Sequence, residues 1–142
     1  MLRAVLDTNV VLAAKRSMHP QSPNAEIITR WMAGEFVWLV SDDVVAEYAE
    51  KLLEKGIDPL KVEQLVADLL QYGEEVPIRF FHFQHYPVDM DDVAFLLVAI
   101  NGAATHVVTY DEHLKDVSVF YPEFVACEPV GFLKDLRISL AP

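Results

Sequence analysis

Short apolar runs alternate along the chain with segments whose apolar residues recur at helical spacing. Residues 2–6 (LRAVL) and 36–40 (FVWLV) have the length and composition of buried strands. Residues 58–73 gather their leucines and valines on one side of a helix and close at Gly73. The pattern predicts strands and helices in alternation, which is typical of α/β folds with a mostly parallel sheet.

Polar residues mark where the predicted helices begin. Asn9 is expected to cap the helix after the first strand, Ser41 the helix after the second strand, and Ser22 or Asn24 the helix between them. The predicted strands are 2–6, 36–40, a segment within 74–83, 106–109 and 124–126. Pro77 places the third of these at an edge or bend of the sheet. The predicted helices are 9–15, 22–34, 41–56, 58–73, 89–102, a short one after Asp111 and one from Pro129.

The chain has 142 residues, 53% of them hydrophobic, with no internal repeat or linker, so we expect one domain over 1–142. The single cysteine, Cys127, cannot form a disulfide within the chain, which favours a reducing cytosol. The N-terminal apolar stretch is broken by Asp7 and lacks a signal-peptide pattern, and no segment approaches the roughly 20 apolar residues of a membrane span. We therefore expect a cytoplasmic protein without a membrane partner.

The formal net charge of −11 argues against binding to a polyanion, because 11 Lys and Arg face 22 Asp and Glu. That argument weakens if several acids converge on one pocket, since divalent cations bound there reverse the local sign of the field. The positions of the acids therefore matter more than their number.

Two acids follow predicted strands, and a third opens a buried helix. Asp7 comes directly after residues 2–6, and Asp111 follows the strand 106–109. Ligands of α/β sheets gather at the carboxyl ends of strands, so both side chains are expected at one edge. Asp92 shares a helix face with the core residue Phe95 and should be partly buried.

Carboxylates packed together raise one another's pKa and lose hydration, and a divalent metal relieves that strain. Mg²⁺ or Mn²⁺ prefers hard oxygen ligands, keeps several waters and bridges to phosphates. Phosphodiester hydrolysis fits this constellation. The sequence has no zinc-type His/Cys spacing, Gly-rich phosphate loop or G-x-S-x-G elbow.

Four motifs, LDTNVVL, SDDVVAEYAEKL, DMDDVAFLLVA and VVTYDEHL, together with WMAGEF and CEPVGFL, resemble the PIN-domain nucleases in the expected order. The likeness is greatest to the bacterial VapC-like toxin components of toxin–antitoxin pairs. It implies a three-layer α/β/α sandwich (PIN-like), Mg²⁺- or Mn²⁺-dependent endoribonuclease activity, frequent homodimers and inhibition by a small antitoxin protein.

By this resemblance four acids are catalytic: Asp7, Glu47, Asp92 and Asp111. Asp7, Asp92 and Asp111 would be the principal metal ligands, and Glu47 a ligand or a water-orienting base. The matching supporting positions are Asn9, Thr109, Asp89 and Asp91, the last two in a D-P-D-D signature that has Met90 in place of proline.

Structural roles compete with these functional ones. Asp7 can cap the helix that follows it. Glu47 lies at the border of an apolar stripe and rests on the resemblance almost alone. Asp89 and Asp91 stabilise a helix N-terminus without any catalytic role.

Other polar residues are secondary candidates. Lys15, Arg16 and Arg30 could contact phosphates near the mouth of the site or be ordinary solvated residues, and Asp116 could lend a further oxygen. His82 and His85, three apart, and His106 and His113, which flank the last acid, are read as structural rather than as ligands.

The sequence thus predicts an endoribonuclease for single-stranded RNA, because unpaired strands expose their bases. Two alternatives stay open: a non-catalytic PIN-fold interaction module, and a nuclease for structured nucleic acid or DNA.

Overall fold

The structure is a computed structural model that describes residues 1–19, 21–79 and 90–142. Its strands are β1 (Arg3–Leu6), β2 (Val37–Val40), β3 (Glu74–Glu75), β4 (His106–Val108) and β5 (Val125–Cys127). Its helices are α1 (Thr8–Arg16), α2 (Pro23–Met32), α3 (Asp42–Glu54), α4 (Pro59–Tyr72), the short 3₁₀ helix η1 (Met90–Asp92), α5 (Val93–Asn101), α6 (Glu112–Ser118) and α7 (Pro129–Leu140).

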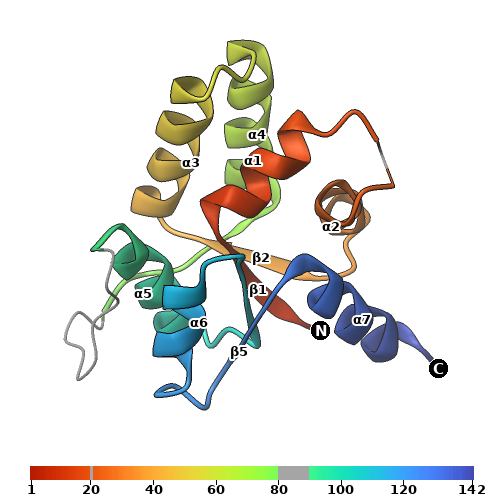
Figure 1. The fold of residues 1–142 in the computed structure, drawn as a ribbon, viewed down its shortest axis with the longest axis vertical. Coiled ribbons are helices and arrows are strands. Elements are labelled where there is room, and N and C mark those ends of the chain that lie inside the picture. Colours follow the sequence, from red (N-terminus) through yellow and green to blue (C-terminus); the bar gives the residue numbers. More distant parts are fainter. Residues whose placement is uncertain (20, 80–89) are drawn as a thin grey trace.

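The five strands form one parallel sheet in the order β3-β2-β1-β4-β5. Helices α3 and α4 stand on one side of the sheet, and α5 and α6 lie on the other (Figure 1). The predicted α/β/α sandwich with a mostly parallel sheet is confirmed, with every pairing between the described strands parallel. The order reverses at β1, which pairs with β2 on one edge and with β4 on the other.

Serine side chains cap two of the helices, α2 and α3. The Ser22 hydroxyl accepts from the backbone N–H of Ala25, and the Ser41 hydroxyl accepts from that of Val44, as the sequence predicted. Of the two caps that the sequence offered for α1, Asp7 is the one observed. Its carboxylate accepts from the Thr8 N–H, and Asn9 lies two residues further on, inside the first turn.

Three predicted boundaries need correction. The third strand is only the two exposed residues Glu74 and Glu75, which pair with the end of β2 and stop before Pro77. The helix predicted over 89–102 begins as a 3₁₀ turn, and its α-helical part starts at Val93. The last strand lies one residue later than predicted. His82, His85 and Asp89 lie outside the described residues.

Large buried side chains join the helices to the sheet. The Trp31 and Trp38 rings meet edge to face with centroids 4.7 Å apart, and Phe36 meets Phe132 in the same way at 5.0 Å. Helix α5 has an almost wholly apolar sequence and contacts β1 and β2. No helix in the described parts of the chain is long and apolar enough to cross a membrane.

A close backbone approach fixes the end of α5. Gly102 follows that helix, and its carbonyl oxygen accepts hydrogen bonds from the Arg3 guanidinium. A methyl group at Gly102 would lie 2.9 Å from Val76 Cγ2 and 3.1 Å from Leu39 Cδ1. This position therefore requires glycine because α5 packs tightly against the sheet.

Gly102→Ala should destabilise the protein by about 1–3 kcal/mol, because the added methyl overpacks a core contact. Chemical denaturation monitored by circular dichroism measures the change. Gly131→Ala is the matched control: it lies within α7, and its added methyl meets only Cys127 Cβ, at an ordinary 3.5 Å. The control should be stabilised by roughly 0.5–1 kcal/mol. Equal effects of the two substitutions would contradict the packing argument.

Candidate active site

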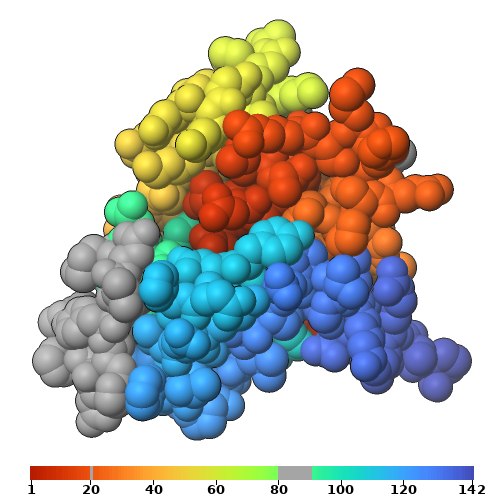
Figure 2. Space-filling model, viewed as in Figure 1, coloured from red at the N-terminus to blue at the C-terminus, as the bar shows by residue number. Residues whose placement is uncertain are grey.

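A cleft of about 260 Å³ opens at the carboxyl ends of β1 and β4. In Figure 2 the surface is hollowed where the start of α1, helix α3 and the segment leading into α6 meet. The cleft is lined by Asp7, Thr8, Asn9, Leu12, Glu47, Lys51, Lys55, Asp91, Asp92, Phe95 and Asp111. The structure thus brings together all four acids predicted to be catalytic, from four separate elements.

Asp7 directly follows β1 and is 6% exposed. Its Oδ1 accepts from the Thr8 backbone N–H at 2.8 Å, and its Oδ2 accepts from the Thr109 hydroxyl at 2.7 Å. These two bonds orient the carboxylate, which also lines the cleft. The helix-cap role and a place in the cleft therefore coexist in one side chain.

Thr109 connects the first acid to the last. Its side chain is fully buried, and its Oγ1 also accepts from the Asp111 backbone N–H at 2.9 Å. Asp111 Oδ1 accepts from the His113 N–H at 2.9 Å and so caps α6. The sequence did not foresee this cap. One hydroxyl thus fixes the backbone of Asp111 and the carboxylate of Asp7.

Glu47 is positioned by the residue that follows it. The buried Tyr48 hydroxyl donates to the carbonyl of Leu6, which immediately precedes Asp7, and accepts from Trp38 Nε1 at 3.2 Å. These bonds tie α3 to the end of β1. Partial burial raises the pKa of Glu47, and nearby Asp91 raises it further, whereas Lys51 opposes the shift.

Asp92 is 5% exposed and stands at the start of α5. Its carboxylate makes no capping hydrogen bond to the described first turn of that helix. Phe95 lies three residues on and lines the same cleft, as the helical spacing predicted. Asp91 is exposed at the cleft edge.

The predicted phosphate contacts lie elsewhere. Lys15 is half-buried, burial lowers its pKa, and the nearest acid acting on it is Asp68 of α4. Arg16 donates to the carbonyl of Lys55 at 3.1 Å instead of lining the cleft. Neither side chain lines the cleft, because each has a partner on a neighbouring helix or its end.

The other secondary candidates also have structural partners. Arg30 pairs with Glu26 and Glu35. His106 Nε2 lies 2.9 Å from Asp135 Oδ2, in line with its structural reading. Asp116 and His113 are not among the described residues that line the cleft, and the His113 contact to Asp111 is made by its backbone.

Three polar residues of the cleft were missed by the sequence analysis: Thr8, Lys51 and Lys55. A signal for the lysines was present, since they follow Glu47 by four and eight residues and share its side of α3. Thr8 follows Asp7 directly, and no sequence pattern separates it from an ordinary first-turn residue.

The donor set fits a hydrated hard cation. Among the described residues, no group of three His, Cys, Asp or Glu converges closely enough to hold a metal ion directly. Mg²⁺ needs only one or two carboxylates when it keeps its waters. The buried Thr8 hydroxyl lines the cleft and has no hydrogen-bond partner in the described chain, so it offers an oxygen to such a water.

Comparison with known proteins identifies the family. The family model of the PIN domain matches residues 3–113. The chain belongs to the PIN domain family. The match contains all the acids of the cleft, whereas β5 and α7 lie beyond it.

A solved structure with the same fold is VapBC2 from Rickettsia felis, crystallised with a DNA fragment from its promoter. The matched chain is 14% identical with a TM-score of 0.58, over 88% of this PIN domain chain and 97% of the other chain. No curated protein matches the sequence. At 14% identity this similarity supports only the fold of the chain, not its activity.

Glu47→Gln should stabilise the metal-free PIN domain at pH 7. The folded-state pKa of Glu47 lies above its unfolded value, so wild-type stability falls as pH rises between these two values. Glutamine at position 47 has no carboxyl group to ionise, so the variant does not lose this stability as pH rises. The gain in thermal midpoint should vanish below about pH 4, where glutamate is protonated in both states.

Thermal melts across pH in a chelating buffer measure this difference. The control is Glu63→Gln, an exposed glutamate on α4 away from the cleft. A gain at Glu47 that persists at acid pH, or that the control reproduces, would show that ionisation at the cleft is not its cause.

Proposed function

We propose that this chain, as one PIN domain over 1–142, is a Mg²⁺- or Mn²⁺-dependent endoribonuclease that hydrolyses phosphodiester bonds in single-stranded RNA. The observation that carries the proposal is the convergence of Asp7, Glu47, Asp92 and Asp111 in one cleft at the switch point of the sheet. Carboxylates in this arrangement suit phosphodiester hydrolysis, which needs hard-cation binding and an oriented water.

Burial and hydrogen bonding support the residue roles in this proposal. Asp7, Asp92 and Asp111 would hold the metal, one or two of them directly and the rest through its retained waters, and the metal would supply an activated water and stabilise the leaving oxygen. Thr109 keeps the Asp7 carboxylate in one orientation through its 2.7 Å bond. Glu47, with its raised pKa, serves as a ligand or takes a proton from the attacking water.

Two further cleft residues have supporting roles in this proposal. Asn9 is exposed in the first turn of α1 and offers its amide to the substrate or to ordered water. Asp91 adds negative charge at the cleft edge and strengthens cation binding there. Asp89 belongs to the same acidic signature in sequence and lies outside the described residues.

The family and the similarity to VapBC2 support the proposed substrate and partners. Single-stranded RNA can bend into a cleft at a strand edge, whereas a regular duplex hides its base edges. The similarity to VapBC2, a complex bound to promoter DNA, supports a toxin role with a small antitoxin partner. In this proposal the toxin acts as a homodimer in the cytoplasm.

A non-catalytic interaction module and a nuclease for DNA or structured nucleic acid are the alternatives. The convergence of Asp7, Asp92 and Asp111 in one cleft favours catalysis over the first, because neighbouring carboxylates repel one another and a bound cation relieves that repulsion. The second shares the acid cluster and is distinguished by substrate.

Asp7→Asn and Asp92→Asn should each lower Mn²⁺-dependent cleavage of a single-stranded RNA panel by at least about 100-fold, because each removes a charged metal ligand. Gel analysis of labelled RNA, DNA and hairpin substrates measures the activity and separates the alternatives. Asp58→Asn, which caps α4 outside the cleft, is the control and should retain activity. Equal cleavage by the wild type and both cleft variants would refute the proposal.

Millimolar Mn²⁺ should raise the thermal midpoint of the wild type by several degrees, because a ligand that binds only the folded state stabilises it. Differential scanning fluorimetry measures this shift without any substrate. Asp92→Asn should lose most of the shift while keeping a cooperative transition. An unchanged wild-type midpoint would favour the non-catalytic module.

A further inference from the structure

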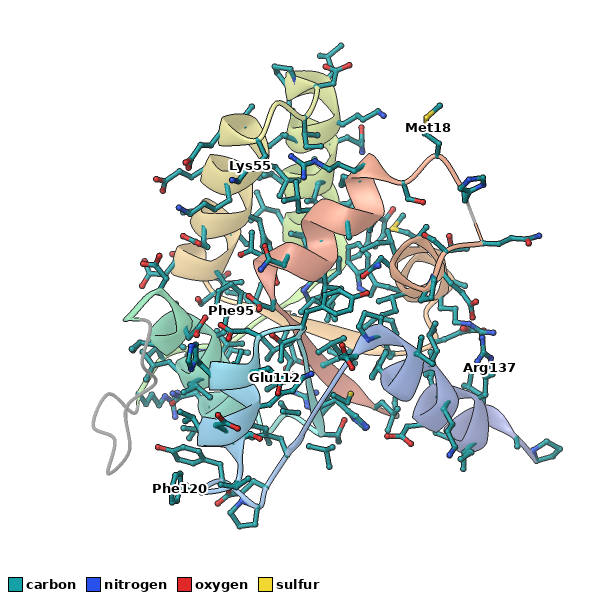
Figure 3. All side chains as sticks on the ribbon, viewed as in Figure 1. Met18, Lys55, Phe95, Glu112, Phe120 and Arg137 are labelled. Carbon is teal, nitrogen blue, oxygen red and sulfur yellow. The ribbon has the colours of Figure 1, made fainter. Side chains whose placement is uncertain are left out.

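Two lysines line the acidic cleft: Lys51 on helix α3 and Lys55, the C-cap residue that follows it. Lys51 and Lys55 follow Glu47 at intervals of four residues, so the three side chains lie along one side of the helix. At 1.5 Å per residue, the strip from Glu47 to Lys55 is about 12 Å long. In Figure 3, Phe95 marks the acid end of this strip, and Lys55 lies at the C-terminal end of α3.

Four of the nine other Lys and Arg residues, all within the described parts of the chain, are held in ion pairs. These four are Arg3, Arg30, Lys115 and Arg137, and their partners are Glu74, Glu26, Glu35, Glu112 and Glu128. The two cleft lysines are held less firmly than these four. Lys55 forms no ion pair with any described residue, and its carbonyl, not its ammonium, binds Arg16.

Lys51 is held only weakly. Its Nζ lies 3.6 Å from Glu54 Oε2, and the Glu54 side chain is 57% exposed. A solvent-exposed pair at this distance is worth little, so the ammonium can exchange this partner for another anion. The pKa of Lys51 is raised, first by Glu54 and then by Glu47, so the side chain stays charged at neutral pH.

We propose that Lys51 and Lys55 form a phosphate-binding strip that holds backbone phosphates of the RNA beside the scissile bond. The inference rests on the proposed function and names the subsite that receives the chain. Lysine ammonium groups act as point charges and bind phosphate oxygens in any orientation, so the strip fixes the backbone without reading bases. One helical turn, about 6 Å, separates the two lysines and suits neighbouring phosphates of an extended strand.

The strip also reduces the electrostatic repulsion between the acidic cleft and the RNA backbone. An RNA strand that approaches the acids is repelled unless nearby cations offset its phosphates. The metal bound by the acids neutralises the scissile phosphate, and the lysines neutralise the phosphates that flank it. Local placement of two cations therefore allows RNA binding by a chain whose net charge is −11.

The test measures binding of a fluorescent single-stranded RNA 12-mer in the Asp92→Asn background, which removes cleavage. Lys51→Gln and Lys55→Gln should each weaken binding several-fold, equally for different sequences. Each should also lower the slope of log K against log salt by about 0.7, the value for one phosphate contact on a single strand. The double variant should lower it by about 1.4.

The matched control is Lys134→Gln, an exposed lysine of α7 outside the cleft, which should leave the slope unchanged. In the otherwise wild-type protein, the double variant should raise KM for RNA more than it lowers kcat. If the lysine variants have the same salt slopes and KM as the Lys134→Gln control, the phosphate-binding strip is wrong. A role of these lysines in binding a protein partner would give that result. If the wild type fails to cleave RNA but the lysine variants still lose binding, the hydrolase proposal fails and the strip stands.

Discussion

The cleft depends on the hydrogen bond from the Thr109 hydroxyl to Asp7 Oδ2. It joins residues 102 positions apart in the sequence, and it exists because β1 and β4 are parallel neighbours with Leu6 opposite Val108. That register carries the residues after both strands to one edge, where the Asp7 N–H also donates to the Val108 carbonyl at 2.9 Å. A buried carboxylate is costly unless donors surround it, and the strand ends supply them.

The sheet alone would bring two acids together, and helices supply the other two. Tyr48 attaches α3 to the carbonyl before Asp7, so Glu47 cannot shift relative to the first acid without breaking a buried hydrogen bond. Asp92 instead depends on apolar packing, since α5 buries Phe95 and Leu96 beneath it. The apolar core thus holds the acids close together and away from water, which lowers the free energy of unfolding.

The fold and part of the site were predictable from local patterns. Buried runs at 2–6 and 36–40 fixed two central strands, and the strand-end rule located Asp7 and Asp111. Contacts between elements were not predictable in this way. The sequence places Lys15 beside the first acid, yet the packing of α1 against its neighbours turns it toward α4, while Lys51, distant in sequence from Asp7, enters the cleft.

Residues beyond the family match contribute to the site indirectly. The Thr109 N–H donates to the Cys127 carbonyl at 2.8 Å, so β5 fixes the backbone of the residue that binds Asp7. Phe132 of α7 packs against His106 of β4, and Asp135 binds the same imidazole. Strand β4 is thereby held on both edges and on one face. A strand paired on both edges is held in place more firmly than an edge strand. The pairing of β4 on both sides therefore fixes the backbone that leads to Asp111.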